Sequence, residues 1–299
     1  MSDDELQGNP EYSTPFASPV GGWPDREELR LDDSYVTGLF HHKPPSVGDL
    51  PPVLYLHGIQ SHPGWFFASA GQLAANGHEV FQVARRGSGA NHGDRGHARS
   101  ARQTLDDVQA AIRFVLERTG SRRVALVGVS WGGKLAAAFC ASSDAEAIAS
   151  LTLVAPGMVP LIDVSPVTKL AIAACLLVRP RARFDIPLGA PELFTDNESM
   201  QEFIRTDRLA LHCATARFMY ASRCLDRLIG RAPAGCLKMP VTLILSAHDR
   251  IIDSVATARS IIRLTAERAE IISLSGAHTL EFQEDPVAFY QALLTACEK

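Results

Sequence analysis

The sequence lacks the features that mark several large classes of protein. Its six cysteines include no C-x-x-C pair and no metal-type spacing with histidine, so we expect reduced thiols and no metal site. Basic residues do not outnumber acidic ones, and the net charge is −4 with an isoelectric point near 6.2. Such a balance provides no global attraction to nucleic acid, and we expect no nucleic-acid partner.

Long apolar runs are also missing. The longest strongly apolar stretch, Leu170–Val178, is too short to span a bilayer. The N-terminus is acidic and polar, which argues against a secretory signal. We therefore expect a cytoplasmic protein without stable membrane insertion.

What the sequence does contain is a repeated alternation of short apolar runs and helix-prone segments. The expected strands are Val53–His57, Glu79–Ala84, Arg123–Val129, Ser150–Val154, Val241–Ser246 and Glu270–Leu274. The expected helices lie near 65–76, 101–118, 131–142, 253–266 and 285–297. Loose alternation from Leu29 to Phe40 favours an early edge strand or hairpin. Repeated β-α-β units of this kind predict an α/β fold, a mostly parallel sheet with helices on both faces.

The alternation stops between residues 157 and 239. This segment contains no convincing strand but has helical patterns near 165–178, 197–212 and 214–230. We interpret it as a helical lid inserted over the strand ends, where such sheets bind ligands. An additional structural layer of helices is the alternative. The expected organisation is a flexible arm at 1–25, a core at 26–156 and 240–299, and a lid at 157–239.

The most informative segment is Val124–Gly133, an apolar run that ends in Ser130 between glycines. Its first six residues have the composition of a strand buried on both faces, and the alanine-rich residues that follow favour a helix. A strand that turns sharply into a helix at G-x-S-x-G is a nucleophile elbow, which makes Ser130 the candidate nucleophile. The alternative is a turn of small residues, because this pattern arises by chance in about one chain in ten of this length.

A serine hydroxyl needs a base to take its proton and an acid to orient that base. Two late strands end beside candidates, at Asp249 and at His278 in a Gly-Ala-His turn. The chain order Ser130, Asp249, His278 is the order found with nucleophile elbows of this kind. We assign His278 as the base and Asp249 as the acid. Asp253 is the alternative acid, but its place before the following helix favours a role as the cap of that helix.

An oxyanion hole needs two N–H donors aimed at one point. Trp131 directly follows the candidate nucleophile, and its backbone N–H is the first expected donor. The second is the N–H of Ile59, because Gly58 permits a tight turn in the loop after the first strand of the core. His57 and His62 in this loop could be read as metal ligands, but without a third ligand nearby we favour a turn-stabilising role.

The residues expected to line the substrate pocket are Gln60, Trp65 and Phe66 from the core and Leu176 and Phe203 from the lid. The apolar lid residues would suit a medium or long acyl chain, and plain packing of lid on core is the alternative. The stripe of apolar residues in the lid, with arginines nearby, also suggests transient contact with a membrane surface, although such stripes are more often core.

Several of these motifs together resemble those of α/β-hydrolases, and within that group the monoacylglycerol lipase and lysophospholipase-like serine hydrolases. The matching segments cover most of residues 50–295: His-Gly-x-x-x-His at 57–62, Arg-Gly-Ser-Gly at 86–89, Gly-x-Ser-x-Gly-Gly at 128–133, Ser-Ala-x-Asp-Arg-Ile-x-Asp at 246–253 and Gly-Ala-His at 276–278.

The resemblance implies a mostly parallel, eight-stranded type of sheet with a helical lid. It also implies the triad Ser130, His278 and Asp249, the oxyanion donors Ile59 and Trp131, and no metal or organic cofactor. One departure concerns Trp131, because these relatives often have Met or Gln there, and the tryptophan ring is expected to narrow the acyl pocket.

The expected activity is hydrolysis of carboxylic esters, such as monoacylglycerols or lysophospholipid-like molecules, through an acyl-enzyme. Acyl transfer and hydrolysis of C–C bonds by the same triad remain alternatives. A non-catalytic binding protein on this fold is a further hypothesis, although such relatives usually lose a triad member and none is missing here.

Overall fold

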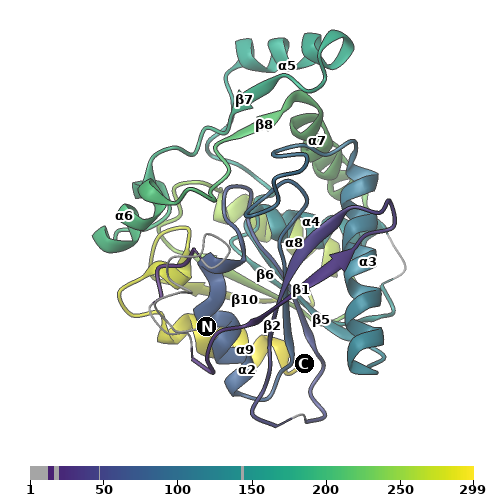
Figure 1. Ribbon diagram of the computed structural model, residues 1–299, viewed down its shortest axis with the longest axis vertical. Coiled ribbons are helices and arrows are strands. Elements are labelled where there is room, and N and C mark those ends of the chain that lie inside the picture. The colour runs from purple at the N-terminus through teal and green to yellow at the C-terminus, as the bar shows by residue number, and fades with distance from the viewer. Residues whose placement is uncertain (1–12, 17–19, 47, 143–144) are drawn as a thin grey trace.

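A computed structural model describes residues 13–16, 20–46, 48–142 and 145–299. A twisted sheet of eight strands, in the order β1-β2-β4-β3-β5-β6-β9-β10, forms its centre (Figure 1). The strands are β1 (Asp25–Arg30), β2 (Val36–His42), β3 (Val53–Leu56), β4 (Val80–Val83), β5 (Val124–Val129), β6 (Ile148–Val154), β9 (Val241–Ser246) and β10 (Glu270–Leu274).

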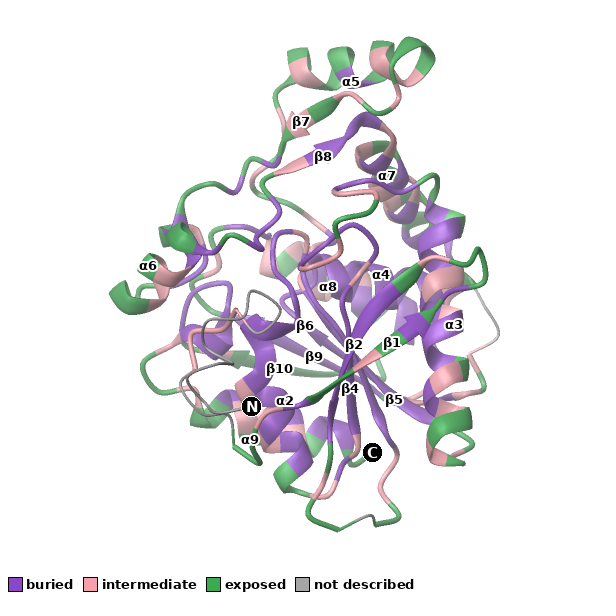
Figure 2. Ribbon diagram, viewed as in Figure 1, coloured by how far each residue is buried: buried purple, intermediate pink, exposed green. Residues whose placement is uncertain are grey.

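The strands from β4 to β10 run parallel, and β1 and β2 form an antiparallel hairpin at one edge. The predicted parallel α/β sheet and the early hairpin are thus confirmed. β3, β4, β5 and β9 are buried along their whole length (Figure 2). Burial on both faces explains why these strands are continuous apolar runs in the sequence.

Helices cover the sheet. Those of the core are α2 (Phe67–Ala75), α3 (Ala101–Thr119), α4 (Trp131–Ser142), α8 (Ser254–Thr265) and α9 (Val287–Cys297). α2 packs against α9, while α3 packs against α4. Their bounds agree closely with the predicted helices, and α3 and α8 begin at side-chain caps. Ser100, for example, accepts a hydrogen bond from the N–H of Gln103 at the start of α3, and Gly120 ends that helix at a φ of 69°.

The segment between β6 and β9, called the cap below, lies beyond the carboxyl ends of the parallel strands (Figure 1). It comprises α5 (Pro166–Val178), β7 (Arg183–Asp185), the 3-10 helix η3 (Pro191–Leu193), α6 (Glu198–Thr206), β8 (Cys213–Thr215) and α7 (Ala216–Arg231). α7 packs on α4 of the core and on α5, which lies at the far end of the molecule.

Two expectations for the cap were wrong. The cap does contain strands, because β7 and β8 pair as a small antiparallel sheet. Each has only three residues, too few for an alternating pattern to stand out. The helix expected over 197–212 ends at Thr206 because Asp207 leaves the helical conformation, with a ψ of 107°, and turns its carboxylate into the core.

Among the described residues, no helix is long and apolar enough to cross a membrane. Of the arm expected at 1–25, residues 1–12 and 17–19 lie outside the described part of the chain. Ser13 and Val20 lie against the core, since a Cβ at Gly64 or Gly71 would meet their carbonyl oxygens.

Candidate active site

The turn between β5 and α4 holds Ser130 in an uncommon backbone conformation. Its φ is 53°, in the left-handed region that non-glycine residues rarely occupy. Its N–H donates to the carbonyl of Val154 at 2.9 Å, and its own carbonyl accepts from the N–H of Gly157 at 2.8 Å. The neighbouring strand β6 and the loop after it therefore fix the strained turn from both sides.

The glycines around Ser130 are required by crowding. A Cβ at Gly132 would lie 2.3 Å from the carbonyl oxygen of Leu56, and one at Gly128 would lie 2.7 Å from that of Gly132. Real Cβ atoms do not approach carbonyl oxygens this closely, so side chains at these positions would push α4 away from the sheet. The glycines permit the close approach of strand, helix and loop that the elbow needs.

The structure brings the three predicted triad residues together. Ser130 Oγ lies 2.9 Å from His278 Nε2, and His278 Nδ1 lies 2.8 Å from Asp249 Oδ2. The histidine and aspartate side chains are each only 2% exposed. With the Nδ1 proton directed to the carboxylate, Nε2 is free to accept the serine proton, which is the arrangement a general base requires.

The alternative acid, Asp253, has a different role. Its carboxylate accepts from the N–H of Ala256 at 2.9 Å and caps α8 as expected. Asp249 is oriented by two backbone donors, since its Oδ1 accepts from the N–H groups of Ile251 and Ile252 at 2.8 and 3.0 Å. Its second oxygen is thereby directed to His278.

The expected oxyanion donors lie on the two segments that meet at Ser130. Gly58 borders the nucleophile so closely that a Cβ there would be 3.3 Å from Ser130 Cβ and 3.6 Å from Ser130 Oγ. The N–H of Ile59 follows on this loop, and the N–H of Trp131 begins α4, where helix geometry supplies no acceptor. Among the backbone hydrogen bonds recorded outside helices and strands for the described residues, none uses either N–H.

Each carbonyl of the loop from Gly58 to Ser61, called the oxyanion loop below, has a donor. The imidazole Nδ1 of His57 lies 2.9 Å from the Gly58 oxygen. The other donors are Arg85 Nη2 on Ile59, Leu211 N–H on Gln60 and Ser88 Oγ on Ser61, at 2.8, 2.8 and 3.1 Å respectively. A loop held at every residue can present a fixed N–H to a reacting oxygen.

His57 and His62 are turn-stabilising residues, as expected. His57 Nε2 accepts from the N–H of Arg85 at 3.0 Å, and burial together with the Arg85 charge holds the pKa of His57 well below its usual range. His62 Nδ1 accepts from the N–H of Gly64 at 3.2 Å. No group of three potential metal ligands occurs within the described ranges.

Sequence reasoning missed Asp207, a buried acid that joins the cap to the core. Its carboxylate lies 3.0 Å from His62 Nε2 and accepts from the indole N–H of Trp65 at 2.7 Å and from the N–H of Leu209 at 2.9 Å. Burial alone would raise the pKa of Asp207, but the hydrogen bonds with His62 and Trp65 outweigh it and lower this pKa. An aspartate inside a helical pattern gave no signal of these distant partners.

Three of the five residues expected to line a pocket are buried. Trp65 is buried in an aromatic cluster, with ring centroids 6.1 Å from Phe203 and 5.2 Å from Phe282. Phe66 and Gln60 are also buried, while Leu176 lies half-buried on α5. Trp65 and Phe203 join core to cap, as the packing alternative predicted, and the pocket role of all five residues stays a prediction.

A second buried acid, Glu281, stands three residues after His278. Its carboxylate accepts from the N–H of Ser69 at 2.7 Å and is hydrogen-bonded to the Ser69 hydroxyl, which ties the histidine loop to the start of α2. Burial raises the pKa of Glu281 to about 8, against the opposing effect of these hydrogen bonds. Near neutral pH this carboxyl therefore remains largely protonated.

The parallel sheet, the elbow and the arrangement of serine, histidine and aspartate define the α/β-hydrolase fold. Two solved structures share it. The monoacylglycerol lipase of Paleococcus ferrophilus matches with a TM-score of 0.76 and 18% identity, over 87% of this chain and 98% of its own. A soluble variant of the Saccharomyces cerevisiae monoglyceride lipase, solved with a substrate analogue, matches with a TM-score of 0.79 and 16% identity, over 92% and 94%.

The chain belongs to the family of hydrolases described as serine aminopeptidase S33, whose model matches residues 51–285. Its sequence is also similar to the phospholipase YtpA of Bacillus subtilis (strain 168), with 25% identity over 204 residues. That similarity covers 67% of this chain and 76% of the phospholipase. The predicted membership of the α/β-hydrolases is thus confirmed, and the protein is a hydrolase.

Substitution of Gly132 tests the crowding at the elbow. Gly132→Ala should lower the free energy of unfolding by about 2–3 kcal/mol, because the new methyl group would overlap the carbonyl oxygens of Leu56 and His57. Gly230→Ala is the matched control, since a Cβ there meets nothing within 4 Å and alanine favours its helix. Urea unfolding should separate the two variants, and equal stability would contradict the account of the elbow.

The buried Glu281 predicts a pH dependence of stability. The pKa of this carboxyl rises from 4.5 to about 8 on folding, so the folded protein binds more protons and loses stability as the pH rises from about 5 to 8. Glu281→Gln keeps the neutral shape and should escape this loss. The melting temperature of the wild type should therefore fall relative to that of the variant across this range. The exposed control Glu284→Gln should differ from the wild type by a constant melting temperature across this range. The same result for Glu281→Gln would refute the raised pKa of Glu281.

Proposed function

We propose that the protein is a serine esterase that cleaves carboxylic esters of medium or long acyl chains, such as monoacylglycerols or lysophospholipids, through an acyl-enzyme. The observation that carries the proposal is the chain of short contacts from Ser130 through His278 to Asp249. Beside it lie the backbone N–H groups of Ile59 and Trp131, which have no backbone acceptor among the described residues. This is the geometry that acyl transfer to a serine requires.

In the proposed mechanism, Ser130 Oγ attacks the ester carbonyl carbon while His278 Nε2 takes the hydroxyl proton. The negative oxygen of the tetrahedral intermediate accepts hydrogen bonds from the N–H groups of Ile59 and Trp131. As the intermediate collapses, the protonated His278 gives its proton to the leaving alcohol. Water then attacks the acyl-enzyme by the same steps, which releases the carboxylic acid and restores the serine.

Two observations support a lipid ester as the substrate. The phospholipase and the monoacylglycerol lipases to which the chain is similar carry names of lipid-cleaving enzymes. The cap, which lies over the strand ends, has an apolar outer helix, α5, whose side chains Leu170 and Leu177 are 72% and 88% exposed. A substrate with a long acyl chain would meet a favourable surface there.

A panel of substrates tests this proposal. Ser130→Ala should lower kcat for p-nitrophenyl esters and monoglycerides at least ~10⁴-fold without loss of folding, because no other group supplies the nucleophile. The control Ser260→Ala removes a half-exposed hydroxyl on α8 and should leave kcat unchanged. Retained turnover by Ser130→Ala would overturn the assignment.

The same panel distinguishes the competing reactions. Aminoacyl anilides, as substrates of an aminopeptidase, should be cleaved far more slowly than esters from acetate to oleate. A new ester formed when a short alcohol is added would indicate acyl transfer instead of hydrolysis. Absence of reaction with a fluorophosphonate probe would indicate a non-catalytic binding protein.

We also propose that α5 makes transient contact with membrane surfaces that contain the substrate. The exposed residues of α5 include Val167 and Val178, each 76% exposed. Arg179 directly follows this helix, and Arg183 begins β7. Apolar side chains that face solvent beside basic ones suit the boundary of an anionic bilayer. The apolar surface would insert at shallow depth, and the arginines would lie near the phosphate groups.

Co-sedimentation with vesicles tests this contact. The double variant Leu170→Ser/Leu177→Ser should bind vesicles of phosphatidylcholine and phosphatidylglycerol several-fold more weakly than the wild type. It should retain kcat on a short, water-soluble ester, because neither residue lies at the triad. Val255→Ser, a loss of an exposed apolar residue on α8, is the control. Equal binding by the wild type and the double variant would contradict the proposal.

A further inference from the structure

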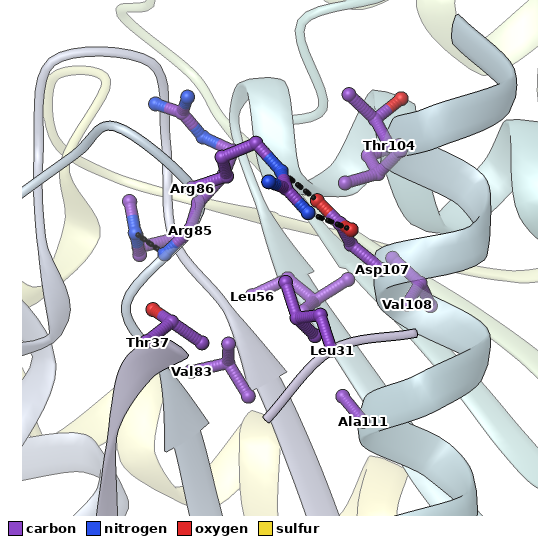
Figure 3. A pocket seen from close by; sticks show the side chains of 12 residues that line it. Leu31, Thr37, Leu56, Val83, Arg85, Arg86, Thr104, Asp107, Val108 and Ala111 are labelled. Atoms are coloured by element: carbon purple, nitrogen blue, oxygen red, sulfur yellow. Dashed lines mark hydrogen bonds and ion pairs between the residues drawn. The ribbon is translucent and has the colours of Figure 1, made fainter. Parts of the chain in front are cut away.

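Two consecutive arginines follow β4, and they have opposite environments. Arg86 forms ion pairs with Asp107 and Asp33, both at 2.8 Å, and Figure 3 shows it turned toward Asp107. Arg85 as a whole is half-buried, and it forms no ion pair with any described carboxylate. Its Nε and Nη1 atoms are nonetheless buried, and they have no hydrogen-bond partner among the described residues.

A buried guanidinium without a counterion is costly, and burial lowers the pKa of Arg85 to about 9. The group therefore stays protonated at neutral pH but is only partly compensated. An apolar side chain of similar length would fill this space at a lower cost. The Arg85 charge lies beside the candidate oxyanion hole, and this position offers a reason why an arginine occupies the site.

Arg85 contacts the carbonyls on both sides of the first oxyanion donor, the N–H of Ile59. Its Nη2 donates to the carbonyl of Ile59 at 2.8 Å and more weakly to that of Gly58 at 3.4 Å. Its backbone N–H donates to His57 Nε2, so that His57 Nδ1 is the protonated nitrogen and donates to the same Gly58 carbonyl. The Gly58 carbonyl and the Ile59 N–H belong to one rigid peptide unit, so fixing the oxygen fixes the direction of the N–H.

Arg85 also contacts the residue that carries the second donor. Its guanidinium carbon lies 4.8 Å from the centroid of the Trp131 ring and 5.2 Å from that of Phe218 on α7. These two rings stack at 5.2 Å, and the Trp131 indole N–H donates to Ser222 of α7 at 3.0 Å. One side chain thus touches the oxyanion loop, the residue after the nucleophile and, through Phe218, the cap.

We propose that Arg85 is a positioning residue of the oxyanion hole: it orients the Ile59 N–H and the start of α4, and its buried charge favours the anionic tetrahedral intermediate over the neutral ester. The inference rests on the proposed function, because it assumes a reaction that passes through an oxyanion at Ser130. With the neutral ester bound, the Arg85 guanidinium has no negative partner. In the tetrahedral intermediate, the oxyanion is a negative neighbour in a site of low polarity.

The test compares Arg85→Met and Arg85→Lys with the wild type and with Arg102→Met, a control that removes an 84% exposed arginine from α3. Arg85→Met should lower kcat about 10- to 100-fold for an ester that the wild type cleaves, with KM changed less than about threefold. Arg85→Lys, which restores charge but not the planar fork, should lie in between. The control should match the wild type.

A second readout separates positioning from a loss of folding. Trifluoromethyl ketones add to a catalytic serine as anionic adducts, so their affinity should fall across the variants in proportion to kcat/KM. The rate of labelling of Ser130 by a fluorophosphonate should fall with it, measured per correctly folded molecule. Wild-type affinity and labelling rate in Arg85→Met would overturn the inference, as would a lower kcat explained wholly by unfolded protein.

The labelling rate also keeps the two proposals apart. If the wild type reacts with the fluorophosphonate but cleaves no ester, the esterase proposal fails while the effect of Arg85→Met on labelling still decides the role of Arg85. If the wild type reacts with neither, both proposals fail.

Discussion

The strained turn at Ser130 is the constraint on which the rest of the site depends. With φ at 53°, this residue turns the chain directly from β5 into α4 and leaves the N–H of Trp131 at the start of that helix. The conformation persists because hydrogen bonds from Gly157 and to Val154 oppose its relaxation. It also requires glycine where α4 passes the carbonyl of Leu56 at the end of β3. The strained turn is thus held by contacts with β6, with the loop after β6 and with the end of β3.

The cap is a structural part of this site. The oxyanion loop accepts a hydrogen bond from Leu211 of the cap, and His62, which follows this loop, contacts the buried Asp207. On the other side, Phe218 of α7 stacks on the ring of Trp131. A movement of the cap would therefore shift both candidate oxyanion donors. A substrate that moves the cap would change the geometry of the reaction through these contacts.

Most of the fold was predictable because its signals are local. Apolar runs of four to seven residues marked the buried parallel strands, and Ser130 and His278 each follow such a run within a glycine-containing turn. Chain order then related them to Asp249. The contacts of Arg85 and Asp207 could not be predicted in this way, since their partners lie far away in the sequence. Strands of three residues and a helix that ends at a buried acid likewise depend on tertiary contacts rather than on local pattern.

The central claim is that Ser130 becomes acylated during turnover, and mass spectrometry of the intact and digested protein measures this most directly. After rapid acid quench of the wild type with an activated long-chain ester, the account predicts one added acyl group, on the peptide that contains Ser130. The adduct should accumulate in His278→Ala only slowly, because the base that activates the serine is missing. An ester consumed without any adduct on Ser130, or an adduct on another residue that forms and decays at the rate of turnover, would contradict the account.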